Sequence, residues 1–143
     1  MRIAVDFDGT IVEHRYPAIG REIPFATETL RMLIADRHSL ILWTVREGKL
    51  LDEAVEWCRQ RGVEFYAVNR DYPEEEGNHE NFSRKIKADL FIDDRNVGGM
   101  PDWGTIYQMI KEHSTWEDIV RRRCSRSIDE ISAPKRKKKW GIF

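Results

Sequence analysis

Four short apolar runs alternate along the chain with stretches whose apolar residues repeat at helical spacing. The apolar runs are residues 3–7, 39–45, 64–69 and 88–94, and their β-branched and aromatic content is typical of strands. The second run, SLILWTV, is almost continuously apolar, as expected for a strand that is buried on both faces. The pattern therefore predicts four strands.

The segments between and after these runs carry apolar residues three and four positions apart, which indicates amphipathic helices. We expect helices over residues 25–36, 51–58, 103–110 and 116–131. Because strands and helices alternate, the expected fold is a three-layer α/β/α, Rossmann-like fold with a parallel sheet. A chain of 143 residues suits one domain, which we place at 1–133, followed by a basic tail at 134–143.

In a parallel α/β sheet the ligand binds beyond the carboxyl ends of the strands. The first run leads into Asp6 and Asp8, the second into Thr44, and the fourth into Asp93 and Asp94. We expect these side chains to meet at one edge of the sheet. Four carboxylates at one edge repel each other strongly unless a cation lies between them, and Mg²⁺ prefers such oxygen ligands. The sequence therefore predicts a Mg²⁺ site made by the four aspartates.

The same edge offers groups that suit a phosphate. We predict phosphate or substrate binding by Gly9, Thr10 and Arg46, although Arg46 could equally pair with one of the carboxylates. Lys85 or Lys87, just before the fourth run, could add a positive charge. Two carboxylates that are two residues apart face the same side of an extended chain, so one could attack phosphorus while the other transfers a proton.

The motif DFDGT at 6–10 resembles the first signature of the haloacid dehalogenase superfamily of phosphohydrolases. The segments LWTVREG at 42–48 and SRKIKADLFIDDRN at 83–96 are similar to its later signatures, in the same order. The resemblance extends over approximately residues 1–110. It implies a Mg²⁺-dependent phosphatase of the small type that has no cap domain.

The resemblance also implies catalytic roles. Asp6 is the expected nucleophile, which forms an aspartyl-phosphate, and Asp8 is the expected general acid and base. Thr44 is expected to bind the phosphoryl group, and Lys85, in preference to Lys87, is the expected catalytic lysine.

The metal ligands implied by the resemblance are Asp6, Asp93 and the backbone carbonyl of Asp8. Asp94 is expected to be a further ligand or a partner of one. The carboxylate at position 8 also argues against dehalogenase activity, because the dehalogenases of the superfamily lack a carboxylate there.

Members of the superfamily that act on small metabolites usually carry a cap domain after the first or the third strand. The corresponding segments, 11–24 and 70–83, are loops too short to fold alone, and 11–24 could form a small hairpin. We therefore expect an open site. It would take a phosphorylated small molecule or the phosphorylated end of a macromolecule, or be closed by a second copy in a homo-oligomer.

Two other functions stay open. A phospho-acceptor signalling domain that does not hydrolyse its phosphate, or a phosphotransferase of the same fold, would use similar residues. In receiver domains, however, the phosphorylated aspartate ends the third strand, and here the paired aspartates end the fourth. The basic run KRKKK at 135–139 suits either nucleic-acid binding or a solvated tail.

The overall composition adds little to this picture. The net charge of −1 gives no general attraction to nucleic acid or acidic membranes, and no apolar run reaches the length of a membrane span. We expect no membrane partner and a cytoplasmic location. Cys58 and Cys124 lie among apolar residues of expected helices, so we expect both to be buried thiols.

Overall fold

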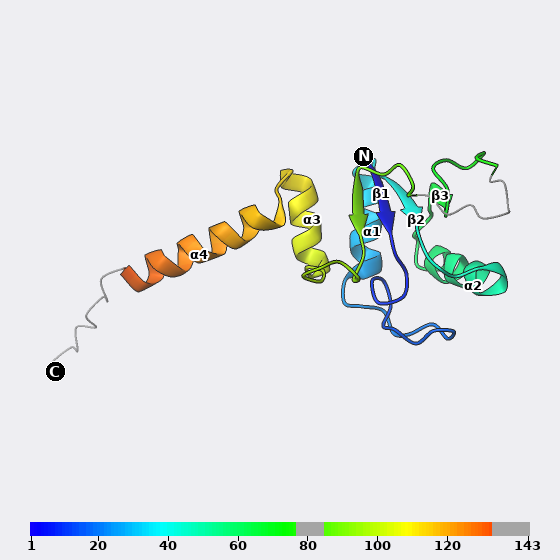
Figure 1. The fold of residues 1–143 in the computed structure, drawn as a ribbon, viewed down its shortest axis with the longest axis horizontal. Coiled ribbons are helices and arrows are strands. Elements are labelled where there is room, and N and C mark those ends of the chain that lie inside the picture. Colours follow the sequence, from blue (N-terminus) through cyan, green and yellow to red (C-terminus); the bar gives the residue numbers. More distant parts are fainter. Residues whose placement is uncertain (77–84, 133–143) are drawn as a thin grey trace, which may run out of the picture. The chain divides into compact units, whose positions relative to one another are not determined.

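The structure of the chain, a computed structural model, describes residues 1–76 and 85–132 (Figure 1). Part of the loop expected at 70–83 and the whole of the basic tail lie outside the described residues. The elements, in chain order, are β1 (Arg2–Val5), α1 (Ala26–Ala35), β2 (Ser39–Leu42), α2 (Gly48–Arg59), β3 (Ala67–Val68), β4 (Leu90–Ile92), α3 (Trp103–Glu112) and α4 (Trp116–Ser132).

The four strands form one parallel sheet with the order β3-β2-β1-β4. Val5, the last residue of β1, pairs with Leu42 of β2 and with Ile92 of β4. The three strands therefore end level with one another, at the same edge. The predicted α/β fold with a parallel sheet is confirmed, and the described part of the chain contains no cap domain.

Both faces of the sheet are buried, which explains why the strands lack polar alternation. The crossovers from β1 to β2 and from β2 to β3 run in the same direction along the sheet, so the right-handed connection general to parallel strands puts α1 and α2 on the same face. On that face the Phe7 ring packs edge-on against Trp57 of α2, with the ring centroids 5.8 Å apart. On the other face Ala4, Ile41 and Ala67 form a buried cluster with Ile86.

The strands are shorter than the apolar runs predict, because the chain leaves the ladder where the site begins. The run at 39–45 contributes only Ser39–Leu42 to β2, and the run at 88–94 only Leu90–Ile92 to β4. Beyond Leu42 the backbone N–H of Thr44 donates to the side chain of Asn69 instead of to a strand. The residues at the carboxyl ends are thereby freed from pairing and can face a ligand.

The segment 11–24 is a small hairpin, as its sequence allowed. The backbone N–H of Glu13 donates to the carbonyl of Arg21, and that of Ile23 donates to the carbonyl of Ile11. The side chain of Glu22 then accepts a hydrogen bond from the backbone N–H of Thr27, in the first turn of α1. The hairpin thus leads directly into the helix.

The chain divides into two compact units, residues 1–107 and 108–143, with the boundary inside α3.

Cys58, in the first unit, is buried as expected, but the expectation for Cys124 is wrong, because its thiol is exposed. Cys124 follows three consecutive arginines on α4, and residues 120–126 are all exposed. Among the described residues, no helix has the length and apolarity of a membrane span.

Candidate functional site

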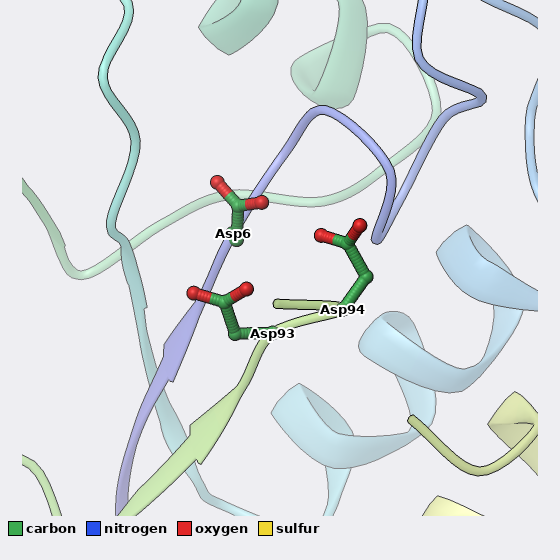
Figure 2. A group of neighbouring side chains, drawn as sticks. All are labelled: Asp6, Asp93 and Asp94. Carbon is green, nitrogen blue, oxygen red and sulfur yellow. The ribbon is translucent and has the colours of Figure 1, made fainter. Parts of the chain in front are cut away.

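Three carboxylates gather beyond the ends of β1 and β4 (Figure 2). Asp6 follows β1, Asp93 and Asp94 follow β4, and one oxygen atom from each lies within 4.8 Å of the others. The pairing of the two strands causes this proximity, since the backbone N–H of Asp6 donates to the carbonyl of Ile92. The convergence expected of Asp6, Asp93 and Asp94 is therefore present in the structure, whereas the side chain of Asp8, the fourth aspartate of the predicted Mg²⁺ site, is not part of this group.

The crowding of these carboxylates has an electrostatic cost. The pKa of Asp6 is raised to about 6, first by burial and then by the negative charges of Asp93, Asp94 and Asp8. A hydrogen bond from the backbone N–H of Phe7 acts in the opposite direction and lowers the pKa. A raised carboxyl pKa means that the negative form of Asp6 is disfavoured in the folded chain.

The donor set suits Mg²⁺, the cation expected from the sequence. Every ligand atom that Asp6, Asp93 and Asp94 offer is a carboxylate oxygen, the type that Mg²⁺ selects over the nitrogen and sulfur ligands of transition metals. A divalent cation would also offset the repulsion that raises the pKa of Asp6. Magnesium binding itself stays a prediction.

Thr10 and Gly9 shape this cluster from the turn that follows β1. Thr10 is fully buried, and its hydroxyl lies 3.2 Å from an oxygen of Asp94 and 3.4 Å from an oxygen of Asp6. The same hydroxyl oxygen accepts a hydrogen bond from the backbone N–H of Asp94. Thr10 therefore links the two strand ends, a role that no pattern in the sequence indicates, while its predicted contact with a phosphate stays a prediction.

Gly9 stands where a side chain would collide with the cluster. Its φ is +90°, and a Cβ at this position would lie 2.5 Å from an oxygen of Asp94 and 2.7 Å from the ring of His14. A side chain at position 9 would therefore displace Asp94 and His14 and strain the backbone, so glycine is favoured there whether or not a phosphate binds.

A cavity of about 530 Å³ opens beside the carboxylates. It is lined by Asp6, Asp8, His14, Tyr16, Trp43, Thr44, Val45, Asp93 and Arg95. Thr44 reaches this wall because Asn69, at the end of β3, binds its backbone N–H at 2.8 Å. The predicted nucleophile, proton-transfer group and phosphoryl ligand, which are Asp6, Asp8 and Thr44, therefore face one cavity.

Arg46 forms a buried ion pair with Asp8. Its Nε lies 2.6 Å from Oδ2 of Asp8, and its Nη2 lies 2.7 Å from Oδ1. The Arg46 side chain is fully buried, and the hydrogen bonds to Asp8 raise the pKa of the guanidinium. Of the two roles that the sequence left open for Arg46, the structure shows the pairing with a carboxylate, and substrate binding by Arg46 stays a prediction.

Neither candidate lysine lines the cavity. The ammonium of Lys85 lies 4.9 Å from the ring centroid of Phe91, two residues before Asp93 in the chain. Lys87 lines a hollow with Met1 and Ser39, at the amino ends of the strands and therefore at the opposite edge of the sheet. Of the two lysines Lys85 is the better placed, and its catalytic role stays a prediction.

Several wall residues did not emerge as site residues from the sequence. Trp43 and Val45 flank Thr44, and alternation along a strand would place these two on the face opposite Thr44 rather than all three on one cavity. His14 lies in the hairpin, with its Nε2 4.0 Å from an oxygen of Asp94. Asn69, which supports Thr44 from outside this wall, is the last residue of the third apolar run and has a left-handed φ of 52°, which asparagine tolerates better than most residues.

The chain resembles a solved structure from Bacteroides thetaiotaomicron that is described as a conserved protein. The two are 74% identical over 83% of this chain and 96% of the other, with a TM-score of 0.77. The chain belongs to the family of that conserved protein. The description of the relative names no activity, no family model matches the chain, and no curated protein matches it. The function must therefore be argued from the site.

The first prediction concerns Gly9. Gly9→Ala should lower the free energy of unfolding by about 1–3 kcal/mol more than Gly98→Ala, because only the former adds a steric clash. Gly98 is the matched control, since its φ is +95° and a Cβ there would meet nothing within 4 Å. Urea denaturation of both variants measures the difference, and equal losses would contradict the clash with Asp94.

The second prediction concerns the buried ion pair. Arg46→Met should destabilise the chain by about 3–5 kcal/mol, because it leaves the buried Asp8 carboxylate without a partner. Arg59→Met, which breaks an exposed pair with Glu56, should cost less than about 1 kcal/mol. The double variant Asp8→Asn/Arg46→Met should recover most of the loss in urea denaturation. A double variant as unstable as Arg46→Met would contradict this account.

The third prediction concerns the pH dependence of stability in EDTA. The pKa of Asp6 is raised from 3.8 to about 6 by folding, so its contribution is favourable below pH 4 and is lost as the pH rises through 6. Asp6→Asn, which stays neutral, should therefore be more stable than the wild type at pH 8 by up to about 3 kcal/mol. The two proteins should converge near pH 4.

Urea denaturation at pH 4 and pH 8 tests this dependence. Asp52→Asn, at an exposed position of α2, is the matched control and should change the free energy of unfolding by less than about 0.5 kcal/mol at either pH. A wild type more stable than Asp6→Asn at pH 8 would show that Asp6 is not destabilised by its surroundings.

Proposed function

We propose that the chain is a Mg²⁺-dependent phosphomonoesterase that works through an aspartyl-phosphate on Asp6. The observation that carries this proposal is that Asp6 belongs to the carboxylate cluster and also faces the cavity with Asp8 and Thr44. A cluster that only held a cation would not need a second carboxylate and a hydroxyl on the same wall. The resemblance of DFDGT to the phosphohydrolase signature agrees with this arrangement.

In the first step an oxygen of Asp6 attacks phosphorus, and the bond between phosphorus and the leaving oxygen breaks. Asp8 donates a proton to that oxygen. In the second step Asp8 takes a proton from water as the water oxygen bonds to phosphorus. The bond between phosphorus and the Asp6 oxygen breaks, and phosphate leaves.

The remaining residues bind and orient. Asp6, Asp93 and the backbone carbonyl of Asp8 are the proposed Mg²⁺ ligands, with Asp94 beside them, and the bound cation would neutralise charge on the phosphate oxygens. Thr44 binds a phosphoryl oxygen, and Lys85 would supply a positive charge by swinging past Phe91. The open cavity suits a phosphorylated small molecule or a macromolecular end.

One observation favours a second candidate, a phospho-acceptor domain that hydrolyses its phosphate slowly. Both oxygens of Asp8 accept hydrogen bonds from Arg46, so Asp8 must transfer protons while it is paired with a positively charged guanidinium. Inefficient proton transfer would leave the phosphate on Asp6. The same reasoning applies to a phosphotransferase, in which another acceptor replaces water.

The fourth prediction tests these alternatives. Wild type should hydrolyse p-nitrophenyl phosphate with Mg²⁺ and not in EDTA, and Asp6→Asn should lower turnover by at least about 10³-fold, since it removes the nucleophile. Asp52→Asn is the control and should keep wild-type turnover. Turnover by Asp6→Asn at the wild-type rate would overturn the proposal. Stable labelling of Asp6 by acetyl phosphate without turnover would favour the phospho-acceptor.

A further inference from the structure

We propose that Arg46 is the positioning residue that fixes Asp8 for proton transfer and, through the same guanidinium, fixes the hairpin that walls the cavity. This inference rests on the proposed function, because it assigns a residue to its proton-transfer step. Arg46 itself belongs neither to the carboxylate cluster nor to the lining of the cavity. It acts through Asp8.

The guanidinium is held in one orientation by four hydrogen bonds. Two go to the oxygens of Asp8, and the other two go to the carbonyl of Pro17 at 3.1 Å and the carbonyl of Ala18 at 2.9 Å. The side chain of Arg46 is fully buried, and only 6% of the Asp8 side chain is exposed. A bidentate pair of this kind fixes the plane of the carboxylate as well as its position.

Aromatic rings enclose the guanidinium. Its central carbon lies 5.1 Å from the ring centroid of Phe7 and 5.3 Å from that of Tyr16. Phe7 lies between the two aspartates of the motif, and Tyr16 lines the cavity. Arg46 thus connects the turn that carries Asp8 to the hairpin that carries Tyr16.

This arrangement leaves Asp8 able to react. Each carboxylate oxygen has two lone pairs, and the hydrogen bonds from Arg46 occupy one on each oxygen. Asp8 also lines the cavity, so the remaining lone pairs are available to a leaving oxygen or to water. Lysine could keep the charge at position 46, but it could not reproduce the planar fork.

The fifth prediction uses substrates whose leaving groups increase in basicity. The more basic the leaving oxygen, the more the reaction depends on its protonation by a general acid. The substrates are p-nitrophenyl, phenyl and benzyl phosphate, and the measured quantity is kcat/KM. Arg46→Lys should lose at least about 10-fold more activity toward benzyl phosphate than toward p-nitrophenyl phosphate, because a misplaced acid matters most for the poorest leaving group. A purely structural role would lower all three rates by the same factor.

A double-mutant cycle completes the test. Asp8→Asn should show the same dependence on leaving group, and Arg46→Gln added to Asp8→Asn should lower kcat/KM for benzyl phosphate less than about 3-fold further. This double variant removes both charges, so it provides a folded comparison if Arg46→Lys does not fold. Arg59→Lys, in an exposed bidentate pair with Glu56, is the control and should leave all three rates unchanged.

The outcomes separate this inference from the proposed function. Equal losses on the three substrates, or fully additive losses in the cycle, would overturn the role of Arg46. Turnover by the wild type would still support the proposed phosphatase function. Faster turnover in Arg46→Lys would also overturn it, since Arg46 would then restrain Asp8. A wild type inactive toward all three substrates would overturn both.

Discussion

β1 is held on both sides by parallel backbone pairing, and the position of every central site residue follows from this pairing. Because Val5 is level with Leu42 and Ile92, the residues that continue each strand emerge at one edge. Asp6 is then close to Asp93 and Asp94 without any loop having to bring them together. The ligand edge is thus built on the paired strands at the centre of the sheet.

Electrostatic repulsion opposes the strand pairing that brings these carboxylates together. Burial and three neighbouring carboxylates disfavour the charge on Asp6, whereas Asp8, two residues on, has a guanidinium as its partner. The two aspartates of one short motif therefore lie in contrasting surroundings. The surroundings of Asp6 carry excess negative charge, which suits a cation, whereas the charge of Asp8 is neutralised by Arg46.

The fold and the carboxylate cluster could be predicted from the sequence because they depend on local patterns. Apolar runs mark strands, and in a parallel sheet the residue after a strand marks the ligand edge, so Asp6 and Asp93 were found without knowing the strand order. The choice of partner for Arg46 could not be predicted, because an arginine near several anions has several plausible partners. Asn69 was missed because its role depends on a left-handed backbone, and the burial of Cys124 was mispredicted because helical spacing does not show which face is covered.

The pair of Asp8 and Arg46 also constrains how the family can diverge. Loss of either partner alone leaves a buried charge, while loss of both is tolerated far better. A lineage that exchanges this pair for neutral residues must therefore pass through a destabilised intermediate or change both codons nearly together. Positions 8 and 46 are 38 residues apart in the chain, yet we expect substitutions at the two positions to occur together among relatives.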